Sequence, residues 1–336
     1  MAKRITSIDV AKRAGVSQPT VSRVFSTDSP NVKADKKERV LKAADELGYR
    51  PNVIARMMST SKTNIIGIVM ANITSPFYPY VLDKFLQRLN ALDRQVLLFA
   101  ASANQKVDDI LPLILQYQVD ALIVTSATLS SEMADECARN DMPVILFNRY
   151  VTGANVSAVC ADNVEGGRRI ADLLLDTGHQ QLAYIAGNPD TSTNIDRHKG
   201  FTERLREHGY TKLQHVQGKY TYDAGYYAAY QLLQGTAPPD AIFCANDIMA
   251  IGAMDAAREL GISVPSEVSI VGFDDIPMAS WQAYKLTTIS QEVDEMIDAT
   301  IELLLDKLED PQSTPVLKLV PGQLKIRESV RGISPN

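Results

Sequence analysis

From residue 64 onward, the chain alternates short apolar runs with longer segments of helical periodicity. Several of the runs are apolar throughout, which is typical of parallel strands covered on both faces. The order strand, turn, helix predicts an α/β fold with parallel sheets, and about 270 residues favour two α/β subdomains over one. The predicted strands are 64–70, 95–101, 121–126, 143–148, 156–162, 182–187, 241–246 and 268–275. The predicted helices are 78–92, 104–117, 130–140, 163–177, 196–208, 222–234, 247–260 and 292–309, followed by short strands within 316–327.

The first 48 residues have a different pattern, that of three short helices. Thr6 and Asp9 have the spacing of a capping box at the start of the first helix, and Gly15 is placed to end it. Ser17 is predicted to cap the second helix, with Pro19 in its first turn. The third helix is predicted over 35–47. The side chains predicted to face inward are Val10, Ala11, Ala14, Val21, Val24, Phe25, Val40, Leu41, Ala44 and Leu47.

A short apolar segment separates these two regions. Pro51 opens a possible helix over 52–58, and the residues 59–64 form a polar linker. Because an isolated helix of this length is unstable in water, we expect it to form only against a partner.

The charge is unevenly distributed along the 336 residues. The net charge is −6, but residues 1–62 carry +7 and the remainder carries −13. A basic segment on an acidic body suggests an arm or domain that meets a polyanion. No apolar run reaches the ~20 residues of a membrane helix, and the N-terminus has no apolar core of a secretory signal. The three cysteines, Cys137, Cys160 and Cys244, are predicted to be buried, reduced thiols of a cytosolic protein.

Polar and aromatic residues follow several predicted strands, at the edge where parallel α/β folds bind ligands. They include 72–78, Asn148, Arg149, Asn246 and Asp274. Carboxylates and amides beside aromatic faces suit a sugar or another small polar metabolite. Alternatives remain open at three positions. Asp247 could cap the following helix or bind ligand, the pair Asp274 and Asp275 could form a turn, and Trp281 could be core or a stacking platform.

Signatures of catalysis are absent from the sequence. It contains no GxGxxG, GxxxxGK[ST], GxSxG or HExxH, and no Cys/His cluster that suggests a metal. His179 and His208 look like ordinary helix-end residues. We therefore expect no cofactor and no enzymatic activity.

Two N-terminal segments, "TSIDVAKRAGVSQPTVSRVF" and "RVLKAADELGYRPNVIARMM", resemble the headpiece and hinge of the lactose-repressor-type (LacI/GalR) family of transcription regulators. The later segments "ADNVEGGRRIADLLLDTGH", "DRHKGF" and "VPSEVSIVGFDD" resemble the same family in the same order. The resemblance covers nearly the whole chain. It implies a helix-turn-helix headpiece and a two-subdomain core like that of periplasmic binding proteins, with parallel sheets.

For DNA binding, the resemblance implies that the second helix enters the major groove. Arg23 would read guanine, Gln18 would contact a base, and Pro19 departs from the polar residue often found there. Met58 would act as a minor-groove wedge, and small polar residues would contact phosphates. The implied DNA-binding residues are Thr6, Ser17, Gln18, Pro19, Thr20, Ser22, Arg23, Asn31, Arg56 and Met58.

For the core, the resemblance implies a hinged cleft between two subdomains that holds a small-molecule effector. Arg197 would clamp the ligand, and Asn148 stands where many members have Asp. The implied effector-binding residues are Phe77, Tyr78, Asn148, Arg197, Tyr220, Asn246, Asp274 and Trp281. The implied domains are the headpiece 1–48, the hinge and linker 49–63, an N-subdomain of 64–161 plus 291–321, and a C-subdomain of 162–290 plus 322–336.

The sequence thus predicts a cytoplasmic bacterial repressor that binds a pseudo-palindromic double-stranded DNA operator and then associates with the nucleoid. Its operator affinity would be controlled by a sugar or sugar derivative, and no membrane partner is expected. No heptad pattern follows Arg331, which favours a homodimer over a tetramer. Two alternatives have the same core. A solute-binding protein needs a signal peptide and no headpiece, and an α/β enzyme with a DNA-binding tail needs a reactive group in the cleft.

Overall fold

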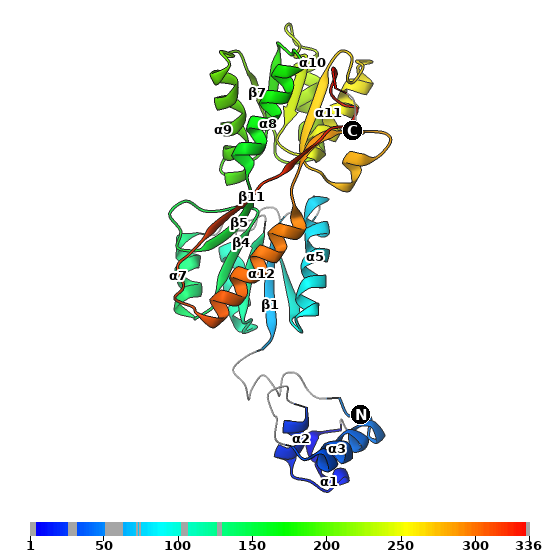
Figure 1. Ribbon diagram of the computed structural model, residues 1–336, viewed down its shortest axis with the longest axis vertical. Helices are drawn as coiled ribbons and strands as arrows, with labels where there is room; N and C mark the ends of the chain where they lie inside the picture. The colour runs from blue at the N-terminus through cyan, green and yellow to red at the C-terminus, as the bar shows by residue number, and fades with distance from the viewer. Residues whose placement is uncertain are drawn as a thin grey trace. The chain divides into compact units, whose positions relative to one another are not determined.

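The computed structural model describes residues 5–25, 32–50, 63–71, 73, 75–101, 107–125 and 130–333. The chain forms two compact units, Met1–Thr63 and Asn64–Asn336. The first contains the helices α1 to α3, and the second contains the remaining helices and all the described strands (Figure 1).

The N-terminal unit contains three helices, α1 (Ser7–Ala14), α2 (Gln18–Val24) and α3 (Ala34–Glu46). The predicted capping box is confirmed, since Thr6 Oγ1 accepts from the Asp9 amide and the Asp9 carboxylate accepts from the Thr6 amide at 2.9 Å. Gly15, with φ of 63°, ends α1 as predicted. The small core of this unit consists of Val10, Ala11, Ala14, Val21, Val40, Ala43 and Ala44.

One prediction in this unit holds in part, and one is wrong. Ser17 is the N-cap residue of α2, as predicted, but its side chain makes no capping bond to a backbone amide and its hydroxyl lies 2.9 Å from the Thr20 hydroxyl. Leu41 is exposed, and Ala43 is buried in its place. With 3.6 residues per turn, Ala43 and Ala44 lie within about 60° of the direction of Val40, one on each side, whereas Leu41 is rotated about 100° away from it.

The larger unit contains two six-stranded sheets, as the predicted pair of α/β subdomains requires. All neighbouring strands pair in parallel except β10 and β12, which are antiparallel. In spatial order, the first sheet consists of β11 (Leu317–Val320), β5 (Ser157–Ala161), β4 (Val144–Phe147), β3 (Ala121–Thr125), β1 (Ile65–Ala71) and β2 (Gln95–Ala101). The second consists of β12 (Gln323–Lys325), β10 (Thr287–Ser290), β9 (Ser269–Asp274), β8 (Ala241–Cys244), β6 (Leu182–Ala186) and β7 (Gln214–Gln217).

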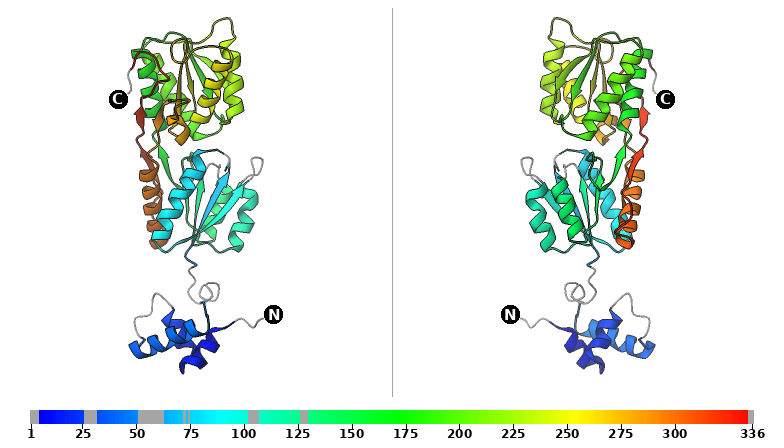
Figure 2. Two further views of the ribbon diagram at one scale, coloured as in Figure 1. Left: turned by 90° about the vertical axis from the view of Figure 1, so that its right-hand side faces the viewer. Right: turned by 90° about the vertical axis from the view of Figure 1, so that its left-hand side faces the viewer.

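Helices lie against both faces of each sheet (Figure 2). This arrangement explains the runs of fully buried residues along β3, β5, β6 and β8. The helices of the first-sheet subdomain are α5 (Phe77–Ala91), η1 (Val107–Ile110), α6 (Leu111–Gln116), α7 (Ser131–Arg139) and α12 (Val293–Glu309). Those of the second-sheet subdomain are α8 (Asn163–Asp176), α9 (Ser192–Glu207), α10 (Tyr222–Leu233), α11 (Asp247–Glu259) and η2 (Pro277–Ser280).

The chain passes from one sheet to the other three times. It leaves the first sheet after Ala161, returns after Ser290, and leaves it again between Val320 and Gln323. The carboxyl ends of β1, β3 and β4 therefore belong to one subdomain and those of β6, β8 and β9 to the other.

Two strands have no counterpart in the predicted elements. The sequence of β7, QHVQ, alternates exposed and partly buried positions at a sheet edge. The sequence of β10, TTIS, is buried although three of its four residues are polar. Its hydroxyls find partners inside the protein, since Thr288 Oγ1 donates to Asp247 Oδ1 at 2.6 Å. Helix α9 begins at Ser192, four residues before the predicted start, because Thr191 caps it.

The three cysteines are buried as predicted, and His179 and His208 lie at helix ends as predicted. Cys137, Cys160 and Cys244 are buried free thiols. His179 follows the C-cap of α8, with its Nδ1 3.1 Å from the Leu174 carbonyl oxygen, and it is also buried, with its Nε2 2.8 Å from Ser269 Oγ. Within the described parts of the chain, every helix is too short or too polar to span a bilayer.

Candidate functional site

A small pocket lies between the two subdomains, beyond the carboxyl ends of their strands. Both subdomains contribute five residues to its lining. These are Ser75, Phe77, Tyr78, Asn148 and Arg149 from the first-sheet subdomain, and Thr193, Arg197, Tyr220, Asn246 and Asp274 from the second-sheet subdomain. The pocket therefore brings together seven of the eight residues predicted to bind the effector. Ser75 and Arg149, which the sequence placed at the ligand-binding edge of the sheet, also line it, and Thr193 joins them without having been predicted.

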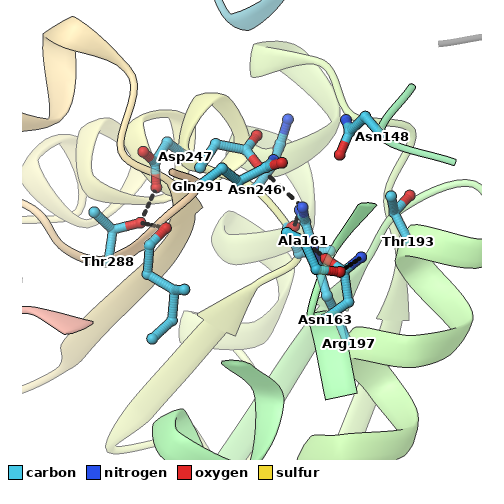
Figure 3. A network of polar contacts seen from close by, with 12 residues as sticks. Asn148, Ala161, Asn163, Thr193, Arg197, Asn246, Asp247, Thr288 and Gln291 are labelled. Carbon is cyan, nitrogen blue, oxygen red and sulfur yellow. Dashed lines mark hydrogen bonds and ion pairs between the residues drawn. The ribbon is translucent and has the colours of Figure 1, made fainter. Parts of the chain in front are cut away.

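Arg197 lines this pocket and is only 2% exposed. Several contacts hold its side chain. Its Nε donates to Asn163 Oδ1 at 2.8 Å, its Nη1 to the Ala245 carbonyl at 2.5 Å, and its Nη2 to Asp274 Oδ1 at 3.0 Å (Figure 3). The guanidinium also stacks 3.7 Å from the centroid of the Phe273 ring. These contacts hold a buried charge in one orientation and compensate it with a carboxylate.

Close packing of α8 on α9 fixes the backbone that carries Arg197. A Cβ atom at Gly200 would lie 1.9 Å from the Val164 carbonyl oxygen, and one at Gly167 would lie 2.4 Å from the Arg197 carbonyl oxygen. Only glycine fits at either position, so the two helices touch through their backbones.

Asp274 ends β9 and faces the pocket with a second partner. Its Oδ1 accepts from Gln291 Nε2 at 2.7 Å as well as from Arg197. Burial raises the pKa of Asp274, and the neighbouring Arg197 charge opposes that rise.

Three non-glycine residues of the pocket lining have a left-handed backbone, with φ of 66° at Asn148, 58° at Tyr220 and 120° at Asp274. Such conformations are unfavourable for non-glycine residues and cluster at binding sites.

Two buried amide oxygens have no hydrogen-bond donor among the described residues. They are Asn148 Oδ1 and Gln291 Oε1, in residues that are only 4% and 6% exposed. The two side chains extend from opposite sides toward the space beside Arg197 (Figure 3). Gln291 also lines an adjoining hollow of about 340 Å³ that shares Phe77 and Asp274 with the pocket. Gln291 was not predicted, because it follows a strand that the sequence pattern did not reveal.

The roles expected of Asn246 and Asp247 are partly exchanged. Asn246 lines the pocket and also caps α11, since its Oδ1 accepts from the Met249 amide at 3.2 Å. Asp247 is not the cap. It is fully buried and accepts from Thr288 Oγ1 at 2.6 Å and from the Ile276 amide at 2.9 Å. Burial, reinforced by the charge of Asp274, raises the pKa of Asp247 to about 7.

The structure does not bring Trp281 to the pocket. Trp281 follows η2 with an extended backbone, and its side chain is 56% exposed. It is neither a core residue nor part of the pocket lining, because the 3₁₀ turn carries it out to the surface. Asp275 also turns away from the pocket and accepts from Arg327 Nη2 at 2.6 Å.

The pocket is closed as the structure stands. Its volume is about 30 Å³. Sites for small molecules usually enclose several hundred Å³. The pocket by itself is therefore too small for a sugar, which would need the adjoining hollow or a movement of the two subdomains.

The outer face of α2 presents most of the predicted DNA-contacting residues of the N-terminal unit. Gln18, Pro19, Ser22 and Arg23 are exposed, Thr6 and Ser17 are exposed beside them, and Thr20 is half-buried. The predicted residues Asn31, Arg56 and Met58 lie outside the described residues.

Hydrogen bonds extend this face from α2 onto α1. Gln18 Nε2 donates to Ser22 Oγ at 3.0 Å and to Ser7 Oγ at 3.3 Å, which fixes α2 on one flank of α1. An ion pair between Arg13 and Glu46 joins α1 to α3. Ile8 follows Ser7 and is 55% exposed. Ser7 and Ile8 were not predicted as part of this surface, since neither has a distinctive spacing or charge.

Within the described part of the chain, no group of three or more His, Cys, Asp or Glu side chains could hold a metal ion. The arrangement instead offers hydrogen-bond donors and acceptors around a closed pocket, and an exposed polar helix in a separate unit.

Comparison with known proteins covers both units. Residues 7–52 match the family model of bacterial regulatory proteins of the lacI family, and residues 171–330 match a periplasmic binding protein-like domain. The HTH-type transcriptional regulator AscG of Escherichia coli is 32% identical over 97% of this chain and 98% of its own length. The HTH-type transcriptional regulator GalS of Salmonella typhimurium is 33% identical over 90% of this chain and 89% of its own.

Solved structures give the same result. The Lac repressor dimer bound to operator and the anti-inducer ONPF has a TM-score of 0.88 and 26% identity, covering 97% of this chain and 99% of its own. The regulator CelR in complex with cellobiose has a TM-score of 0.72 and 28% identity, covering 97% and 100%. A LacI family regulator from Enterococcus faecium with bound ribose has a TM-score of 0.73 and 26% identity, covering 80% and 100%. The chain therefore belongs to the lacI family of bacterial regulatory proteins, and it is a helix-turn-helix transcriptional regulator.

Proposed function

We propose that this protein is a cytoplasmic repressor that binds a pseudo-palindromic DNA operator as a homodimer and is controlled by a sugar bound between its core subdomains. Its core subdomains are proposed to be 64–161 plus 291–321 and 162–290 plus 322–336, which the three crossings of the chain between the sheets support. The solved Lac repressor is a dimer on its operator, which supports the proposed assembly.

The observation that carries the proposed ligand is the pair of buried oxygens on Asn148 and Gln291. A buried acceptor without a donor is costly, so a ligand that donates hydrogen bonds to both is favoured. The one carboxylate of the pocket lining, Asp274, is already paired with Arg197. A neutral, hydroxyl-rich molecule meets both conditions, and relatives of this fold bind ribose and cellobiose.

In the N-terminal unit, the exposed side chains of α2 are proposed to read the major groove. Arg23 has the forked donors that pair with guanine, and Gln18 can hydrogen-bond a base edge. Thr6, Ser17, Thr20, Ser22 and Asn31 are proposed to contact phosphates, and Pro19 to meet a thymine methyl or remain neutral. In the hinge, Arg56 and Met58 are proposed to contact the minor groove, with Met58 as the wedge.

The two sites are proposed to be linked through movement of the subdomains. The effector closes or locks the cleft, which changes the spacing of the two hinge segments in the dimer and therefore the affinity for operator. Coupling of this kind is typically ~1–3 kcal/mol and is reciprocal, so operator DNA changes sugar affinity by the same factor. The effector acts as an inducer if closure releases DNA and as a corepressor if closure promotes binding.

The alternatives are less well supported. A solute-binding protein would not carry the lacI-type headpiece matched by residues 7–52. An enzyme of this fold would need a reactive group in the cleft, whereas the relatives identified here are transcriptional regulators. We therefore propose that the protein is not an enzyme and requires no cofactor.

Thermal unfolding in the presence of a panel of sugars tests the proposed ligand class. A sugar at 100 times its dissociation constant should stabilise the folded protein by ~2.7 kcal/mol. The variants Asn148→Ala and Gln291→Ala should lose most of that stabilisation. The exposed variant Gln180→Ala, far from the pocket lining, serves as a control and should keep it. Stabilisation by phosphates or dicarboxylates but by no neutral sugar would contradict the proposed class.

A further inference from the structure

Tyr150 joins the two core subdomains at the rim of the pocket. It lies three residues after β4, in the first-sheet subdomain, whereas its partners lie in the first turns of α9, in the second-sheet subdomain. The Tyr150 hydroxyl donates to the Asp196 carboxylate at 3.0 Å and 3.2 Å, and the Tyr150 amide donates to Ser192 Oγ at 3.1 Å.

These bonds connect the same two segments that line the pocket. Asn148 and Arg149 directly precede Tyr150 in the sequence, and Ser192 and Asp196 directly precede Thr193 and Arg197. A separation of the subdomains that opens the pocket must therefore part Tyr150 from α9. No covalent connection between the subdomains prevents Tyr150 from separating from α9, because none of the three crossings between the sheets lies at this point.

The groups involved are suited to reversible contact. Tyr150, Ser192 and Asp196 are each half-buried, so water replaces their partners when the contact opens. Burial, together with the neighbouring Asp196 charge, raises the pKa of Tyr150 to about 12. The phenol therefore stays protonated at neutral pH and donates to the carboxylate, as a charge-assisted hydrogen bond requires.

We propose that Tyr150, Ser192 and Asp196 form a latch that holds the cleft closed and limits the rate at which the effector leaves. The proposal rests on the proposed function of the cleft. It adds that closure has its own bonds, separate from those made to the ligand. The latch therefore predicts a cleft that stays closed even before a ligand binds.

The test uses the full chain and the variants Tyr150→Phe and Asp196→Ala. Each removes one side of the hydroxyl–carboxylate bond and leaves the pocket lining unchanged. Tyr222→Phe is the matched control, because the Tyr222 hydroxyl donates to Asp255 at 2.8 Å within the second-sheet subdomain. The double variant Tyr150→Phe/Asp196→Ala measures whether the two side chains act through one another.

The first readout is hydrogen exchange of the protein without ligand. Backbone amides of 148–151 and 192–197 should exchange several-fold faster in both single variants than in the wild type, and the Tyr222 variant should match the wild type. The second readout is stopped-flow dissociation of a sugar that stabilises the wild type. Dissociation should be about 5- to 20-fold faster in both single variants, and the double variant should add little.

Unchanged exchange in Tyr150→Phe and Asp196→Ala would overturn the latch, whether or not a sugar is found. Equal dissociation rates in the wild type and both variants would overturn it as well. Failure of every sugar to stabilise the wild type would instead count against the proposed function, and the exchange measurement would still decide the latch.

Discussion

The guanidinium of Arg197 donates to Asp274 Oδ1 at 3.0 Å, and both side chains are more than nine-tenths buried. Each residue comes from a different element of the second-sheet subdomain, α9 and β9, and both face the pocket. A buried charge of this kind is stable only while its oppositely charged partner is present, because it has lost its contact with water. The pair therefore serves the stability of the subdomain and the shape of the pocket at once.

Removal of Arg197 should affect both properties. Arg197→Ala leaves Asp274 buried without its cation, and breaking a buried pair typically costs about 3–5 kcal/mol of unfolding free energy. Urea unfolding measures this loss, and thermal shift should show no stabilisation by any sugar that stabilises the wild type. Arg168→Ala is the control, since Arg168 pairs with Glu207 at the surface and should unfold like the wild type. A variant Arg197→Ala that retains the full sugar response would contradict the role proposed for this residue.

Asp247 should make stability depend on pH. Its pKa is raised to about 7 in the folded protein by burial and then by the Asp274 charge, compared with an ordinary value near 3.8. The folded state therefore binds this proton more tightly than the unfolded state, and the contribution of Asp247 to stability falls as pH rises from about 4 to about 7.

Thermal unfolding of Asp247→Asn between pH 4.5 and 7.5 checks this prediction. The neutral amide should gain stability relative to the wild type as pH rises through that range. The exposed substitution Asp176→Asn should leave the pH profile unchanged. A constant difference between Asp247→Asn and the wild type at every pH would show that Asp247 does not titrate there.

Gly200 should tolerate no side chain. The Cβ atom of Gly200→Ala would lie 1.9 Å from the Val164 carbonyl oxygen, so α8 and α9 would have to separate. Overpacking of this kind typically costs about 1–3 kcal/mol, which exceeds the roughly 1 kcal/mol that alanine gains over glycine in a helix. Chemical denaturation should show the loss, while the exposed neighbour Lys199→Ala should not. Equal stability of Gly200→Ala and the wild type would mean that the helices part easily.

Arg23 should govern operator preference. Loss of a bidentate contact to guanine costs about 1–3 kcal/mol at the preferred site and little on unrelated DNA. Fluorescence anisotropy with a DNA site selected from a randomised pool measures both affinities for Arg23→Ala. Lys42→Ala, exposed on α3, is the control. If Arg23→Ala discriminates between the selected site and unrelated DNA as well as the wild type does, the proposed placement of α2 in the major groove is contradicted. Wild-type affinity should also fall steeply with salt, because bound Lys and Arg release phosphate counterions.

The architecture could be predicted where local pattern and tertiary structure agree. Strands β3, β5, β6 and β8 are apolar throughout, and their burial on both faces follows from helices on both sides. Strands β7 and β10 were missed because one lies at an edge and the other buries polar side chains that find partners far along the chain. No local signal distinguishes the sequence TTIS of β10 from a loop.

The pocket could be predicted only in part from the residues themselves. Asn148, Asn246 and Asp274 stand where strands end, so the rule for parallel sheets selects them. Arg197 and Tyr220 came from the resemblance alone, since neither follows a predicted strand. Gln291 could not be found, because its place beside Asp274 depends on β10. Trp281 was included for its chemistry, and a short 3₁₀ turn that the pattern does not reveal carries it to the surface.

Another part of the site depends on pairs of residues that are distant in sequence. Asn246 caps α11 in place of Asp247, because the Asp247 carboxylate accepts a hydrogen bond from the Thr288 hydroxyl. The contact of Tyr150 with Asp196 likewise joins two subdomains whose relative position no single segment determines. Burial and partner choice of this kind are set by the folded chain and not by local spacing.

The central claim, that a sugar in the cleft controls DNA binding, is tested most directly by measuring operator affinity with and without a stabilising sugar. Anisotropy at fixed salt would use the selected DNA site and the full-length protein. We predict that a saturating sugar changes the dissociation constant for this site by about 5- to 150-fold in the wild type. The change should disappear in Asp274→Ala. A sugar that binds and stabilises the protein but leaves its operator affinity unchanged would contradict the account.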